Sequence, residues 1–129
     1  MTFNIVTFGC KVNSYESEYI KEQMLNNNYF YEDDYKKSNI IIVNTCSVTN
    51  IADNKCQKMI RSIKRDNPTG ILVVCGCSAE NLRDKYNNMS IDILIGNTKK
   101  SEIVKIINYF TQIYNFNCNM HIFVKWYIC

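Results

Sequence analysis

Three cysteines each stand directly after an apolar run of the chain. Cys10 follows "FNIVTFG", Cys46 follows "IIIVNT" and Cys77 follows "ILVVCG". A helical pattern comes after each, so each thiol is expected just before a helix N-terminus, where the helix dipole and free N–H groups favour the thiolate. Thiolates are soft ligands that select zinc, Cu(I) or iron–sulfur clusters. The three positions therefore indicate a metal site, with plain packing of small buried thiols as the alternative.

The remaining cysteines carry less information. The total of seven is odd, which fits poorly with a disulfide framework. Cys75 falls inside an apolar run and Cys56 inside a helical pattern, so both are assigned to packing, while Cys118 and Cys129 receive no role. His121, the only histidine, could complete a closed zinc site or simply pack. Without it, three cysteines and an open position suit an iron–sulfur cluster.

Composition and motifs narrow the class of protein. The chain of 129 residues is 47% hydrophobic and 21% charged, which is typical of one globular domain. Its net charge of +3 permits a nucleic-acid partner without proving one. No secretory signal or membrane span is recognisable, so we expect a cytoplasmic protein without a membrane partner. No glycine-rich phosphate-binding motif and no H-E-x-x-H occur either, which argues against nucleotide binding at the cysteines.

The elements that must position the cysteines follow from the hydrophobic pattern. Runs rich in apolar and β-branched residues predict strands at 3–8, 39–44, 71–74 and 91–95, with a fifth edge strand at 29–32. Two of these runs, "NIIIVN" and "ILVV", are apolar on both faces, as in a parallel sheet between helices.

Helical patterns lie between the strands. They cover 14–26, 50–66, 79–87 and 99–110. Asn13 with Glu16, and Asn50 with Asp53, resemble capping boxes. Right-handed crossovers then wind the chain into an α/β fold with a single open, mostly parallel sheet of four to five strands and helices on both faces. Because such sheets bind ligands at the carboxyl ends of their strands, the three thiols should converge on one edge.

One helix carries a row of basic side chains at spacings of three and four. The row, called here the basic stripe, consists of Lys55, Lys58, Arg61 and Arg65. Contact with RNA phosphates is one interpretation. An ordinary solvated helix face is the other, and it is favoured because amphipathic helices normally look like this.

Four stretches resemble the N-terminal domain of the radical-SAM methylthiotransferases. They are "TFGCKVNSYES", "VNTCSVTNIADNKCQKMIRSIKR", "VVCGCSAE" and "ILIGNTKK", in the order and spacing of that family. "GCKVN" together with "NTCSVTNIAD" is similar to the type that acts on N6-threonylcarbamoyladenosine 37 of tRNA. The resemblance implies a Rossmann- or flavodoxin-like domain over 1–110, and leaves 111–129 as an unmatched tail, disordered or produced by a frameshift.

The resemblance also implies a cofactor and a reaction. Cys10, Cys46 and Cys77 would hold an auxiliary [4Fe-4S] cluster, and Asn13 and Asn44 would shape its pocket or hydrogen-bond within it, unless they serve as turn or cap residues. The family adds a methylthio group to C2 of the tRNA adenosine and uses S-adenosyl-L-methionine, whose site is not expected in this chain.

The resemblance stops at the radical chemistry. Radical generation in the family needs a C-x-x-x-C-x-x-C motif, and no such spacing exists among the seven cysteines. We therefore expect a truncated chain that is inactive alone, with a separately encoded radical-SAM domain as a candidate partner. Two alternatives remain, a stand-alone iron–sulfur or zinc module without catalysis, and a small α/β interaction protein whose cysteines merely pack.

Overall fold

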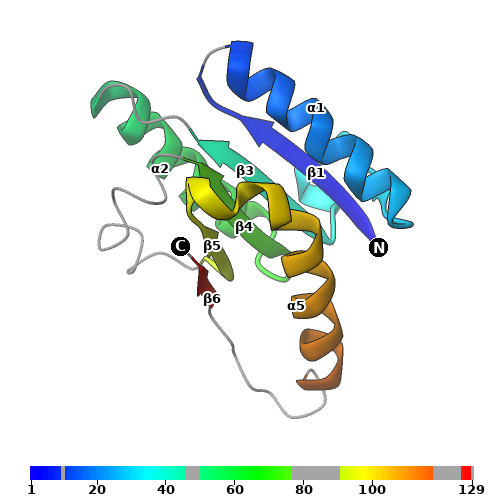
Figure 1. Cartoon of the computed structure of the whole chain (residues 1–129). Coiled ribbons are helices and arrows are strands. Elements are labelled where there is room, and N and C mark those ends of the chain that lie inside the picture. The colour runs from blue at the N-terminus through cyan, green and yellow to red at the C-terminus, as the bar shows by residue number, and fades with distance from the viewer. Residues whose placement is uncertain (10, 46–49, 77–90, 118–125, 129) are drawn as a thin grey trace.

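One sheet of parallel strands forms the centre of the molecule (Figure 1). The computed structural model describes residues 1–9, 11–45, 50–76, 91–117 and 126–128. Within them the strand order is β2-β1-β3-β4-β5-β6, and every neighbouring pair is parallel. The strands are β1 (Thr2–Thr7), β2 (Phe30–Tyr31), β3 (Ile40–Thr45), β4 (Ile71–Gly76), β5 (Ile93–Ile95) and β6 (Trp126–Ile128). The predicted α/β class is confirmed.

Helices cover both faces of this sheet (Figure 1). The described helices are α1 (Lys11–Asn26), α2 (Asn50–Asp66) and α5 (Ile103–Asn117), with short 3₁₀ helices η1 (Tyr35–Lys37) and η2 (Asn97–Glu102). Helices α1 and α5 pack on one face of the sheet, and α2 packs on the other.

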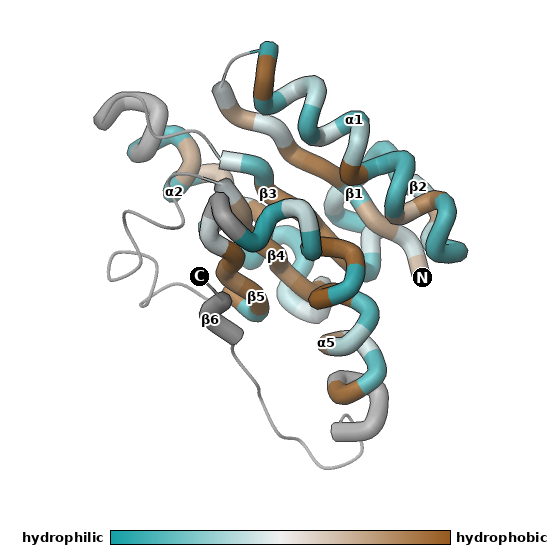
Figure 2. Tube along the Cα trace, viewed as in Figure 1, coloured by the Kyte–Doolittle hydropathy of each residue, from teal (hydrophilic) through white to brown (hydrophobic). Residues whose placement is uncertain are grey.

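The central strands are buried on both faces, which explains their uninterrupted apolar sequence. Ile40 and Ile42 of β3 face the core under α1 and α5, whereas Ile41 and Val43 face the core under α2, and all four are fully buried. Figure 2 shows the difference between strands and helices: β3, β4 and β5 are mainly hydrophobic, whereas the helices carry both hydrophobic and hydrophilic residues. Burial of this kind stabilises the fold by about 25 cal/mol per Å² of apolar surface removed from water, so these strands fix the sheet.

Most predicted elements are present, and their boundaries differ for local reasons. Helix α2 has the predicted range 50–66 and ends just before Pro68, as the turn signal indicated. Helix α1 begins three residues earlier than predicted, at Lys11. The strand predicted at 91–95 is shorter, and the helix predicted at 79–87 lies outside the described residues.

The last twenty residues contain structure that no local pattern predicted. Helix α5 continues to Asn117, beyond the predicted end at residue 110. Residues Trp126–Ile128 form β6, whose register pairs Ile93 with Trp126 and Ile95 with Ile128. The sheet therefore has six strands where four to five were expected, because β6 is a three-residue strand in a stretch without an alternating pattern. Among the described residues, no helix is long and apolar enough to cross a membrane.

Candidate functional site

The three cysteines that were predicted as metal ligands follow the strand ends at the carboxyl edge of the sheet. Cys10, Cys46 and Cys77 themselves lie outside the described residues. The residue directly before each of them is described: Gly9 after β1, and Thr45 and Gly76 at the ends of β3 and β4. Each of the three cysteines therefore follows the end of a strand, and the three strands are neighbours in the sheet.

These strand ends finish at the same level. Thr45 of β3 and Gly76 of β4 are register partners, and Thr7 of β1 is the partner of Asn44. One step further, the N–H of Phe8 donates to the carbonyl oxygen of Asn44 at 2.9 Å. In this strand order the direction of winding reverses between β1 and β3, which is the point where open α/β sheets bind their ligands. The edge thus has the position expected of a binding site.

Two of the three preceding residues need to be glycine. Gly9 has φ 110° and Gly76 has φ 113°, a region that L side chains rarely adopt. A Cβ on Gly76 would also lie only 2.3 Å from the carbonyl oxygen of Thr45. The backbone is therefore free to turn sharply before Cys10 and before Cys77 only because neither glycine carries a side chain.

Asn13 and Asn44, predicted beside the cysteines, are brought together at this edge. Asn13 is the third residue of α1, and its Nδ2 donates to the carbonyl oxygens of Phe8 at 2.8 Å and Thr45 at 3.0 Å. The interpretation of Asn13 as a helix cap is wrong, because this amide points across to β3 instead of closing its own helix. Asn44 is fully buried, and its Nδ2 donates to the Asn13 carbonyl oxygen and to Oγ of Ser17, both at 3.1 Å.

Hydroxyl groups that sequence reasoning missed complete the network. Ser17 Oγ lies 2.7 Å from Oγ1 of Thr7, and Thr45 Oγ1 donates to the carbonyl oxygen of Cys75 at 2.9 Å. Serine and threonine at these positions look like ordinary strand and helix residues in the sequence. Only the folded arrangement shows that they join β1, α1, β3 and β4.

The two described cysteines pack as predicted. Cys75 and Cys56 are both fully buried, Cys75 in the core under α1 and α5, and Cys56 in the core under α2. Burial raises the pKa of the Cys75 thiol from 9.0 to about 12, with the nearby Lys100 ammonium opposing the shift. The neutral thiol lies 4.0 Å from Oδ1 of Asn44. Cys75 is therefore a buried core residue whose thiol is protonated at neutral pH.

The remaining cysteines and the histidine belong to the C-terminal tail. Cys118, His121 and Cys129 lie outside the described residues. The role of His121 as a fourth ligand therefore stays a prediction.

An ion pair that the sequence did not predict borders the edge. The Lys100 ammonium of η2 pairs with the Glu16 carboxylate of α1, and the Lys100 side chain is only 9% exposed. The two residues are 84 positions apart, so no local pattern could have connected them. The pair holds the first turns of α1 against η2, and α1 carries Asn13 and Ser17.

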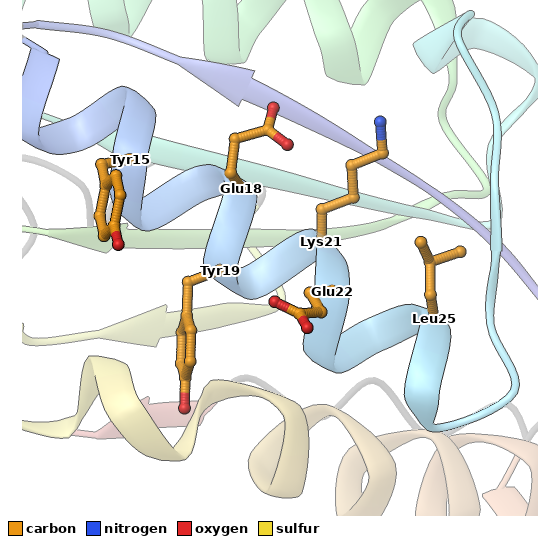
Figure 3. Close-up of a pocket in the computed structure, with 6 residues that line it drawn as sticks. All are labelled: Tyr15, Glu18, Tyr19, Lys21, Glu22 and Leu25. Carbon is orange, nitrogen blue, oxygen red and sulfur yellow. The ribbon is translucent and has the colours of Figure 1, made fainter.

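The surface hollow shown in Figure 3 does not compete with this edge as a site. It measures about 360 Å³, and all its lining residues come from the single helix α1. These residues are Tyr15, Glu18, Tyr19, Lys21, Glu22 and Leu25. Tyr15 is 80% exposed, and no second element contributes a lining side chain. The hollow is therefore a gap between surface side chains.

A protein-family model matches the part of the chain that contains this edge. The family described as "Uncharacterized protein family UPF0004" matches residues 2–96, which includes β1 to β5 and the three cysteine positions. The chain belongs to this family. The match ends at Gly96, so η2, α5 and β6 lie beyond it.

The names of the chain's relatives refer to methylthio modification of tRNA. The chain is 38% identical over 107 residues to a threonylcarbamoyladenosine tRNA methylthiotransferase MtaB of Thermotoga maritima, covering 83% of the chain and 24% of that protein. It is 40% identical over 97 residues to the MtaB of Rickettsia prowazekii, covering 74% of the chain and 21% of the relative. A tRNA-2-methylthio-N(6)-dimethylallyladenosine synthase of Finegoldia magna is 33% identical over 104 residues, which are 74% of this chain and 22% of the relative. The predicted resemblance is confirmed, and the chain spans about a quarter of the length of these relatives.

Proposed function

We propose that this chain is the N-terminal, cluster-binding part of a tRNA methylthiotransferase that acts on N6-threonylcarbamoyladenosine 37. One observation carries the proposal: the residues preceding Cys10, Cys46 and Cys77 lie on the adjacent ends of β1, β3 and β4, in a chain of this family. The two MtaB relatives support the choice of substrate.

The residues at the edge fit an iron–sulfur cluster. Three cysteines provide soft thiolate ligands, and the two glycines that precede Cys10 and Cys77 leave the approach free of side chains. Among the described residues no group of three or more histidine, cysteine, aspartate or glutamate side chains could hold a metal elsewhere. When bound, an auxiliary [4Fe-4S] cluster with three cysteine ligands supplies one open iron that carries the sulfur or methylthio group.

The chain's own residues would bind and position this group and not generate the radical. No C-x-x-x-C-x-x-C spacing occurs in the 129 residues, so the reductive cleavage of S-adenosyl-L-methionine would take place in a segment outside them. The separate radical-SAM domain is accordingly part of the proposal, and so is the inactivity of this chain when it is alone.

Anaerobic reconstitution with iron and sulfide tests the proposal. We expect the purified chain to take up a cluster with sulfide-to-iron charge-transfer absorption, and the variant with Cys10, Cys46 and Cys77 all changed to serine to take up none. Cys56→Ala is the matched control, because it removes a thiol from the core under α2 and should retain full iron content. Equal iron in the triple variant and the wild type would overturn the proposal.

The alternative function, a stand-alone zinc or iron–sulfur module, has a distinct outcome. A stable metal content with no measurable association with tRNA would favour it. Complementation separates the two further, because a methylthiotransferase part should restore tRNA methylthiolation when it is supplied together with a separate radical-SAM domain, and a stand-alone module should not.

A further inference from the structure

The amide groups of Asn13 and Asn44 already have partners for all of their donors. An asparagine side chain offers two N–H hydrogens. Asn13 uses both on the carbonyl oxygens of Phe8 and Thr45, and Asn44 uses both on Asn13 and Ser17. Among the described residues, no buried side-chain nitrogen or oxygen lacks a partner. Neither amide has a hydrogen left to donate to a ligand at the edge.

The remaining atoms of these amides cannot serve a cluster either. Each amide oxygen is a hydrogen-bond acceptor, and the sulfides and thiolates of a cluster are acceptors as well. Oδ1 of Asn44 already faces the Cys75 thiol at 4.0 Å. Direct hydrogen bonding from Asn13 or Asn44 to a cluster would therefore require breaking hydrogen bonds that the fold has made.

The hydrogen bonds of Asn13 instead join the chain segments that lead to different cysteines. Phe8 stands two residues before Cys10, and Thr45 stands one residue before Cys46. Thr45 in turn donates to the carbonyl oxygen of Cys75, two residues before Cys77. A path of hydrogen bonds thus reaches the approach to all three cysteines. Asn13 adds to the pairing of β1 with β3 a side chain that donates to both Phe8 and Thr45.

We infer that Asn13, supported by Asn44, is a positioning residue that ties together the strand ends leading to the three cysteines and does not contact the cluster. The inference rests on the proposed function. A buried amide that holds the carbonyl oxygens of Phe8 and Thr45 restricts both strand ends before any metal arrives, so less order has to be imposed when the metal binds. The expected consequence is slower loss of iron.

Asn67 supplies a matched control. It is also a buried asparagine, and its Nδ2 donates to two carbonyl oxygens, those of Tyr35 and Ser38, both at 2.8 Å. It lies between α2 and β4, at the opposite edge of the sheet from the cysteines. Asn67→Ala therefore removes the same kind of hydrogen bond without touching the strand ends that lead to the cysteines.

The test measures the rate at which the reconstituted chain loses iron to a chelator. We expect Asn13→Ala to lose iron on the order of tenfold faster than the wild type, as is typical when outer-shell partners of metal ligands are removed. Asn67→Ala should match the wild-type rate. Asn13→Ser, which retains one donor and guards against a folding defect in the alanine variant, should fall in between.

A second measurement separates positioning from direct contact. The midpoint potential of the fully loaded Asn13→Ala variant should equal that of the wild type, because Asn13 makes no hydrogen bond to the cluster. A changed potential, an unchanged rate of iron loss, or an equal acceleration in Asn67→Ala would each overturn the inference. Failure of the wild type to bind any cluster would instead overturn the proposed function, and this inference with it.

Discussion

Cys75 shows how strongly burial separates neighbouring cysteines in one sequence. It stands two residues before Cys77, yet its thiol is fully buried and its pKa is raised to about 12. Sequence reasoning assigned Cys75 to packing because it lies inside an apolar run, and its position in the core confirms that assignment. The same reasoning allowed Asn13 to be a cap, since the sequence cannot distinguish an amide that closes its own helix from one that reaches another strand.

Because of the Cys75 thiol, the free energy of unfolding should fall as the pH rises from 9 to about 12. Below pH 9 the thiol is protonated in both states, whereas between pH 9 and about 12 only the unfolded chain releases the proton. The free energy of unfolding should therefore decrease through this window, with Cys75 contributing up to about 1.4 kcal/mol per pH unit. Urea unfolding of the wild type and Cys75→Ala measures the difference, and Cys75→Ala should show the shallower decrease. Identical slopes would contradict the raised pKa.

At the scale of elements, the sheet and α2 were predictable and the contacts between distant elements were not. Helix α2 has its predicted bounds because an amphipathic pattern, an asparagine at its first residue and the Pro68 turn agree with one another. The first residues of the helix predicted at 99–110 belong to the 3₁₀ helix η2, and the buried Lys100 of η2 gives no sequence signal. The edge between β1 and β3 followed from strand order, but the amides and hydroxyls that join it came only from the fold.

The Glu16–Lys100 pair should stabilise the contact between α1 and η2. Glu16→Gln leaves the largely buried ammonium without its counter-charge, so we expect a loss of about 1–3 kcal/mol in the free energy of unfolding. Removing both charges in Glu16→Gln with Lys100→Met should recover part of that loss, because no unpaired charge remains. Lys105→Ala, at an exposed position of α5, is the control and should stay within about 0.5 kcal/mol of the wild type. Additive effects of the two substitutions would argue against coupling.

At the scale of the whole molecule, the basic stripe faces solvent. All four of its residues are exposed on α2, and Ile60 and Ile63 of the same helix are buried against the sheet. This arrangement is that of an ordinary amphipathic helix. It therefore agrees with the solvated interpretation and gives no independent support for contact with RNA.

Changing all four residues of the basic stripe to glutamine should not alter how the affinity for tRNA depends on salt concentration. If the side chains neutralised phosphates, the slope of log affinity against log salt would flatten by about 0.7–0.9 for each phosphate that is no longer neutralised. We expect an unchanged slope, measured by filter binding at two salt concentrations. The matched control changes Lys36 and Lys37, two adjacent basic residues of η1, to glutamine. A flatter slope for the stripe variant alone would favour contact between the stripe and RNA.

The strand order determines which strands can pair first while the chain is being synthesised. Strands β1, β3, β4, β5 and β6 lie side by side in the same order in which the chain is synthesised. Each new strand can therefore join an edge that the previous strand has just provided, and no earlier pair needs to open to admit it. Once the chain has passed Gly76, the three strand ends that lead to the cysteines can already be paired. Strand β5, helix α5 and strand β6 come later in the chain, so pairing of these three strand ends can precede completion of the sheet.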